Sequence, residues 1–314
     1  MAHAHEHHHG HSHAAGHGHT HSHGPASFDR AFAIGTVLNI GIVLTQLIFG
    51  YLANSLALMA DAAHNLSDVA GLLLAWGAAW LSRRGPTAER TYGYRRASIL
   101  AALANSALLL VATGGIAVEA IRRFAQPQQL EAGIVIWVAA LAIVLNGAVA
   151  LMFMRGRHDD PNIKGAFLHM LGDAAVSFGV VLAAVLILWT GWLWIDPAIS
   201  LGIAILVLWA SWGLTRSSVN LALDAVPENV DREKVEVYLN SLSGVTEVHD
   251  LHIWAMSTTE TALTAHLVRP GAGLDDRFIA AACERLDRDF KIHHATLQVE
   301  HSREACRLAP DHVV

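Results

Sequence analysis

The sequence predicts an α-helical membrane protein: a six-transmembrane-helix bundle followed by a C-terminal cytoplasmic α/β domain of order αββαβ. Two observations predict this fold class. First, 53% of the 314 residues are hydrophobic and 15% are charged, whereas a soluble domain averages roughly 25% charged residues. Second, six apolar runs reach the roughly 20 residues that a helix needs to cross a bilayer, and a polar stretch begins only after Val226.

Each apolar run is predicted to be a helix, because a segment in the bilayer interior has to satisfy its own backbone polar groups. The predicted spans are Ala31–Leu52, Ser55–Leu81, Ala97–Ile121, Ala132–Met154, Ile163–Thr190 and Pro197–Leu214. We therefore divide the chain into a histidine-rich tail (1–29), a transmembrane domain (30–220), a cytoplasmic domain (221–303) and a C-terminal tail (304–314).

The positive charges of the short loops predict the orientation. The loops after the second and fourth spans carry Arg83, Arg84, Arg90, Arg95, Arg96, Arg155, Arg157 and Lys164. The opposite side has only Arg122 and Arg123. Since short cytoplasmic loops are enriched in Lys and Arg, we place both termini and the polar domain in the cytoplasm. The net charge of −6 and the lack of a basic block argue against nucleic acid as a partner.

Two of the predicted spans carry the same pair of ionisable residues. His64 and Asp68 are separated by four positions in the second span, and His169 and Asp173 by four in the fifth. This spacing puts both side chains of a pair on one helix face. At 1.5 Å per residue, His64 lies roughly 13 Å from the outer start of its span and His169 roughly 9 Å from the cytoplasmic start of its own. The four groups are therefore expected to meet near the middle of the bilayer.

The chemistry of these four groups predicts transport of a divalent cation. An ionisable group in a membrane span costs about 3 kcal/mol or more and generally marks a functional site. A single such residue can be a helix–helix hydrogen-bond partner instead, but two copies of the motif at matched depth favour a shared site. Two imidazoles and two carboxylates suit Zn²⁺ or a similar ion. Because histidine binds metal only when neutral, metal and protons compete for the same atoms, which predicts proton coupling.

The sequence leaves open two further acidic residues and two alternative functions. Asp61 is an open candidate for a neighbouring acceptor, and Asp196 is expected to be solvated at a span end. An intramembrane zinc hydrolase would need a Glu base beside the ligands, which neither helix supplies. A membrane-bound metal sensor would need no symmetric pair of HxxxD motifs. Both remain alternatives, and we do not expect an enzyme.

The six spans, the two HxxxD motifs and "VHDLHIWAM" in the polar domain resemble the cation diffusion facilitator family, in its zinc-transporting branch, over nearly the whole chain. The resemblance implies a homodimeric antiporter of the bacterial inner membrane that exports Zn²⁺ in exchange for protons, with Cd²⁺ and Co²⁺ as further candidate ions. It implies His64, Asp68, His169 and Asp173 as ligands of the transported ion. The loop after the second span lacks His and Asp, so we predict no metal site there.

The polar stretch predicts a helix, two strands, a helix and a strand, in residues 231–244, 245–256, 260–268, 275–290 and 294–301. This order is typical of a two-layer α/β domain. The resemblance implies that the domain dimerises and binds regulatory Zn²⁺ through His249, His266, His293 and Glu300. His301 is a rival of Glu300, because a one-residue slip exchanges them across a strand. Cys306 lies near where some relatives place cysteine ligands, but its spacing departs from theirs.

Residues 1–24 hold eleven of the 21 histidines, among Gly, Ala and Ser. This composition cannot build a core, so we expect a disordered tract that binds zinc weakly and buffers it near the pore. A dispensable tract is the alternative. In the loop after the second span, Arg95 and Arg96 are free to pair with Asp224 near the end of the last span.

Overall fold

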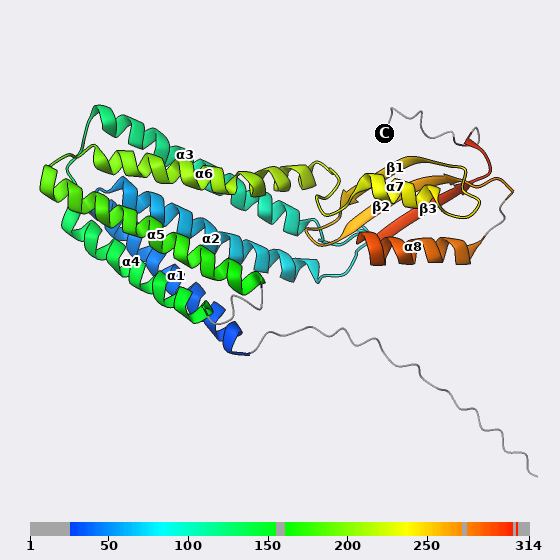
Figure 1. The fold of residues 1–314 in the computed structure, drawn as a ribbon, viewed down its shortest axis with the longest axis horizontal. Helices are drawn as coiled ribbons and strands as arrows, with labels where there is room; N and C mark the ends of the chain where they lie inside the picture. Colours follow the sequence, from blue (N-terminus) through cyan, green and yellow to red (C-terminus); the bar gives the residue numbers. More distant parts are fainter. Residues whose placement is uncertain (1–25, 155–160, 272–274, 304–305, 307–314) are drawn as a thin grey trace, which may run out of the picture.

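The computed structural model describes residues 26–154, 161–271, 275–303 and 306, so the histidine-rich tract lies outside the described residues. Six long helices form the membrane domain, and a small α/β domain follows at one end of the bundle (Figure 1). The helices are α1 (Ala26–Leu52), α2 (Leu56–Ser82), α3 (Ala97–Ala125), α4 (Ala132–Phe153), α5 (Pro161–Thr190) and α6 (Ile195–Ala222). The predicted fold class is confirmed.

Within the described residues, five helices are long and apolar enough to cross a membrane, and α2 is the sixth helix of the bundle. The sequence of α2 is less apolar because it carries Asp61, His64 and Asp68. The helix boundaries lie close to the predicted ones except in α6, which continues past Leu214 to Ala222 and reaches toward the cytoplasmic domain (Figure 1).

The half of the bundle remote from the cytoplasmic domain, which we call the outer half, is closed by packed apolar side chains. There α3 lies along α6, and α4 lies along α5 (Figure 1). Ala57 and Leu58 of α2, Val135 and Ala139 of α4 and Val180 of α5 belong to one cluster, and each is at most 2% exposed. Close packing of small and branched side chains is what holds helices together in lipid.

The corner between α1 and α2 is tied to two other helices. Asp196, in the first turn of α6, accepts hydrogen bonds from Ser55 Oγ at 2.6 Å and from the Leu56 N–H at 2.9 Å. It therefore caps α2, whose first N–H groups lack partners within the helix. Arg123 of α3 donates to the backbone and side-chain oxygens of Asn54 at 2.7 and 2.8 Å. Asp196 is 3% exposed, so the prediction that solvent surrounds it is wrong, because a helix end takes the place of water.

The cytoplasmic domain contains α7 (Arg232–Asn240), β1 (Glu247–Ala255), β2 (Thr261–Val268), α8 (Asp276–Phe290) and β3 (His294–Glu300). β1 pairs antiparallel with β2, and β2 pairs parallel with β3. The core between helices and sheet includes Leu239, Leu263 and Leu286, all 0% exposed. The αββαβ order agrees with the prediction.

A β-bulge in β1 decides which side chains face away from this core. β1 advances three residues, from His249 to His252, while β2 advances two, and Asp250 within this stretch has a φ of +50°. In a regular strand His249 and Ile253 would share a face. The extra residue reverses the alternation, so Ile253 packs in the core while His249 lies on the opposite face of the sheet.

Candidate metal sites

The structure brings the four predicted intramembrane ligands together. His64 and Asp68 come from α2, and His169 and Asp173 come from α5. His64 Nε2 lies 3.9 Å from Asp68 Oδ2 and 3.6 Å from Asp173 Oδ1. His169 Nε2 lies 3.4 Å from Asp68 Oδ2 and 3.6 Å from Asp173 Oδ2. Each imidazole nitrogen therefore faces a carboxylate of the other helix as well as one of its own.

These separations suit a shared cation. Donor atoms bound tetrahedrally to one Zn²⁺ at about 2.0–2.1 Å lie roughly 3.3–3.5 Å from one another. The four nitrogen–oxygen separations here are 3.4–3.9 Å, and His64 and His169 face different oxygens of Asp173, so binding of one ion requires the side chains to draw closer together. Asp68 Oδ2 and Asp173 Oδ2 are buried and have no hydrogen-bond partner among the residues that the structure describes. A buried oxygen without a partner is costly, and a cation bound between the two carboxylates would satisfy both oxygens.

A cavity of about 620 Å³, which we call the vestibule, opens beside these four groups. Asp68 and His169 line it, together with Gly35, Phe153 and Gly165, which lie near those ends of α1, α4 and α5 that face the cytoplasmic domain. The side chain of His169 is 40% exposed, whereas that of Asp173 is 3% exposed. Since apolar packing closes the outer half of the bundle, the four side chains are reached from the end that faces the cytoplasmic domain.

Asp61 is separate from the four ligands. It is 0% exposed, and its Oδ2 accepts hydrogen bonds from Gln46 Nε2 of α1 at 2.6 Å and Ser177 Oγ of α5 at 2.7 Å. Asn65 Nδ2 donates to the Asp61 backbone oxygen at 3.1 Å. Asp61 does not line the vestibule among the described residues. It ties α1 and α5 to α2 about one helical turn outward of His64.

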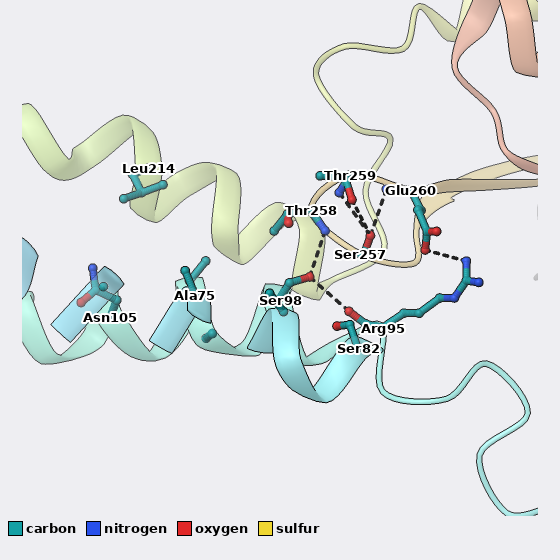
Figure 2. A pocket seen from close by; sticks show the side chains of 14 residues that line it. Ala75, Ser82, Arg95, Ser98, Asn105, Leu214, Ser257, Thr258, Thr259 and Glu260 are labelled. Carbon is teal, nitrogen blue, oxygen red and sulfur yellow. Dashed lines mark hydrogen bonds and ion pairs between the residues drawn. The ribbon is translucent and has the colours of Figure 1, made fainter. Parts of the chain in front are cut away.

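A second cavity, of about 610 Å³, lies between the membrane helices and the turn that joins β1 to β2 (Figure 2). Gly71 and Asn105 line both cavities, so the two adjoin there. The turn touches the start of α3, because the Thr258 N–H donates to Ser98 Oγ at 3.1 Å (Figure 2).

Two ion pairs support this contact between the domains. Arg96 pairs with Asp224 beyond the end of α6, as the sequence permits. Arg95 instead donates to Glu260 of the β1–β2 turn at 2.6 Å (Figure 2). The arginine-rich loop therefore lies on the same side of the bundle as the cytoplasmic domain.

A second cluster lies on the sheet face that the β1 bulge presents. His249, His266, Glu300 and Cys306 offer ligand atoms within 4.8 Å of one another. Glu300 joins them, with His249 Nε2 at 3.1 Å and His266 Nδ1 at 3.2 Å, and Cys306 Sγ lies 3.4 Å from His266 Nδ1. Burial acts to raise the pKa of Glu300, but hydrogen bonds from its neighbours, Gln298 first among them, keep that pKa below its usual value. Imidazole, carboxylate and thiolate are all zinc ligands.

The structure does not bring His293 to this cluster. His293 precedes β3, at the other end of the strand from Glu300, where its Nδ1 accepts a hydrogen bond from the Thr261 N–H at 3.3 Å. Glu300 faces the cluster with 7% exposure, whereas its rival His301 is exposed. The sequence indicated Cys306 as a candidate ligand. Its proximity to His249 and His266 in the structure is the reason to prefer it to His293.

Comparisons with known proteins cover both domains. Residues 32–221 match the transmembrane domain of cation efflux proteins, and residues 227–302 match the cytoplasmic domain of cation efflux proteins. The "Cadmium, cobalt and zinc/H(+)-K(+) antiporter" of Bacillus subtilis (strain 168) is 34% identical over 280 residues, 86% of this chain and 88% of its own length. The "Metal cation efflux system protein CzcD" of Cupriavidus metallidurans is 36% identical over 277 residues, 88% of each chain. The "Zinc transporter ZitB" of Escherichia coli (strain K12) is 34% identical over 263 residues, 83% of this chain and 84% of its own length.

Proposed function

The chain belongs to the cation efflux family, the cation diffusion facilitators, and from that premise we propose that it exports Zn²⁺ from the bacterial cytoplasm across the inner membrane in exchange for protons. Family membership makes it an integral membrane cation efflux protein and not an enzyme. Its cytoplasmic domain is of the family's dimerising type, which implies a homodimer. We propose zinc as the cargo because the donor set suits it and because one relative is named a zinc transporter.

In this proposal His64, Asp68, His169 and Asp173 bind the transported ion, as in the HxxxD branch of the family. The observation that carries it is the pair of buried carboxylate oxygens, Asp68 Oδ2 and Asp173 Oδ2, which lack partners among the described residues and lie 3.4 and 3.6 Å from His169 Nε2. A purely structural role would leave these oxygens hydrogen-bonded.

Transport follows from the ligand chemistry and from the two ends of the bundle. A cation from the cytoplasm enters the vestibule and meets Asp68 and His169, which line it. Metal binding requires neutral imidazoles, so loading releases any protons held there. Once the apolar cluster of the outer half separates, protons from the more acidic side compete with the metal for the same nitrogen and oxygen atoms. Exchange of metal for protons therefore needs no covalent intermediate.

We assign the second cluster a regulatory metal. His249 and His266 lie on β1 and β2, and the turn between these strands contacts α3 through Thr258 and Glu260. A metal ion that cross-links the strands would fix the turn against the membrane domain. We therefore propose that the cytoplasmic cluster senses the metal concentration and regulates transport by the same chain. The proposed boundary between the two domains stays near residues 220–221.

The test is uptake of zinc into proteoliposomes that contain a metal-sensitive dye and carry an imposed pH gradient. We expect zinc flux to rise with the gradient and to fall to the level of empty liposomes when an ionophore collapses it. Magnesium, which dehydrates reluctantly and prefers six oxygen ligands, serves as the matched negative cation. A zinc flux that does not depend on the pH gradient would contradict exchange of zinc for protons.

A further inference from the structure

We propose that Asn39 of α1 supplies a carbonyl oxygen to the cation in the vestibule, and that this oxygen helps to set which divalent ion is carried. The inference rests on the proposed function, because it adds a residue to the same ion pathway. The Asn39 oxygen would contact the ion before the ion reaches the four proposed ligands. Helix α1 would thereby contribute to the choice between divalent cations.

Asn39 combines burial, an unmet acceptor and a place on the cavity wall. The residue is 6% exposed, and within the described part of the chain its Oδ1 has no hydrogen-bond partner. It lines the vestibule together with Asp68 and His169. The other amide of that wall differs, because Asn105 Oδ1 accepts a hydrogen bond from Ser67 Oγ at 3.5 Å. The vestibule wall thus presents two residues with buried, unpartnered oxygens, Asn39 Oδ1 and Asp68 Oδ2.

A cation in the vestibule accounts for both of these oxygens. A hydrated divalent ion has to exchange water oxygens for protein ligands before it reaches four-coordinate binding. A neutral amide oxygen replaces one water without adding negative charge, so it eases dehydration without holding the ion. Ions that accept more than four oxygen ligands gain more from such a group than Zn²⁺, which settles at four. Loss of the Asn39 oxygen should therefore disfavour larger ions such as Cd²⁺ relative to Zn²⁺.

The chain offers a matched control in Asn146 of α4, a helix that packs against α1. Asn146 is 1% exposed and also has one unpartnered side-chain atom. That atom is Nδ2, a donor, which a cation cannot use. Asn146 also does not line the vestibule among the described residues. If polarity or packing in this part of the bundle caused the effect, both substitutions would change uptake. If the loss of a cation ligand caused it, only the Asn39 substitution would change uptake.

The experiment measures initial Zn²⁺ and Cd²⁺ uptake by the full-length protein in proteoliposomes at one fixed pH gradient, for wild type, Asn39→Leu, Asn39→Asp and Asn146→Leu. We expect Asn39→Leu to raise the KM for Cd²⁺ about fivefold more than the KM for Zn²⁺, and so to lower the Cd/Zn uptake ratio at subsaturating ion about fivefold, while the maximal zinc rate stays within about twofold. Asn39→Asp, which keeps an oxygen of the same reach, should retain at least the wild-type Cd/Zn ratio. Asn146→Leu should leave the ratio and both KM values unchanged.

Three outcomes would overturn the inference: a wild-type ratio and KM in Asn39→Leu, an equal shift in Asn146→Leu, or a lowered Cd/Zn ratio in Asn39→Asp. If Asn39→Leu does not fold, the Asn39→Asp result decides alone. Asp68→Ala separates this inference from the proposed function. Wild-type zinc flux in Asp68→Ala would refute the ion site itself, whereas loss of flux there together with an unaffected Asn39→Leu would refute only the role of Asn39.

Discussion

The membrane and cytoplasmic clusters use similar donor atoms but hold them differently. In the membrane cluster, N–O separations of 3.4–3.9 Å leave Asp68 Oδ2 and Asp173 Oδ2 without hydrogen-bond partners. In the cytoplasmic cluster, Glu300 lies 3.1 Å from His249 and 3.2 Å from His266. The side chains of the membrane cluster do not hydrogen-bond closely with one another, which favours a cation that binds and dissociates readily. The cytoplasmic cluster satisfies its own polar groups, so its domain can keep its fold while the metal is absent.

The two clusters also differ in solvent access, because the membrane cluster is the more exposed one. The membrane cluster adjoins the vestibule, and the side chain of His169 is 40% exposed. His249, His266 and Glu300 are 7–8% exposed, and Cys306 Sγ lies 3.4 Å from His266 Nδ1. A transported ion needs a path in and out, whereas a regulatory ion is better retained by burial. The following predictions test this contrast between exchange and retention.

The largest effect is expected from Asp173→Ala. It removes a proposed anionic ligand that lies 3.6 Å from each of the two imidazoles, so zinc flux in proteoliposomes should fall at least about 100-fold. The protein should still insert and dimerise, which size-exclusion chromatography in detergent checks. Asp287→Ala, an exposed carboxylate of α8, is the matched control and should transport normally. Retention of more than a few per cent of the flux in Asp173→Ala would remove this residue from the site.

The next effect concerns selectivity at the membrane cluster. His64→Asp makes the set three carboxylates and one imidazole, a harder and more anionic site that favours ions accepting extra oxygen ligands. We expect zinc transport to persist and the Cd/Zn uptake ratio to rise about tenfold. Paired uptake at a fixed pH gradient measures it, and proton coupling should change as well, because one group that titrates near neutral pH is lost. An unchanged ratio would place selectivity elsewhere in the bundle.

At the cytoplasmic cluster, Cys306→Ala and His293→Ala form a matched pair. Only Cys306 lies with His249 and His266, so Cys306→Ala should weaken binding of the retained zinc ion about tenfold, and His293→Ala should leave it unchanged. Titration against a competing chelator, with the full-length protein carrying Asp173→Ala to silence the membrane site, measures this affinity. The reverse ranking would favour the ligand set that the family resemblance implied.

The smallest effect is expected where the two domains touch. The Arg95–Glu260 pair is partly exposed, at 42% and 33%, so it contributes modestly. Arg95→Glu should lower zinc flux about twofold at limiting zinc, with little change at saturation. Combining it with Glu260→Arg should restore the flux. If the double variant transports zinc as poorly as Arg95→Glu alone, the Arg95–Glu260 ion pair does not couple the cytoplasmic domain to transport.

The sequence by itself determined the class, the six spans and the membrane cluster. These depend on short-range patterns: the length of an apolar run, the loop charges, and a spacing of four that puts two side chains on one helix face. Antiparallel spans in a bilayer of fixed thickness also set the depth of each residue. His64, Asp68, His169 and Asp173 could therefore be placed together before any tertiary contact was known.

Tertiary structure decided the features that join distant parts of the chain. Asp196 caps a helix end 140 residues away, and no local pattern distinguishes such a carboxylate from a solvated one. The bulge at Asp250 reverses the faces of β1, which periodicity alone places wrongly. Cys306 lies with His249 although 57 positions separate them in the sequence, while His293 stays at the far end of β3 from Glu300. Helix and strand periods specify local geometry, whereas long-range contacts depend on how the whole chain packs.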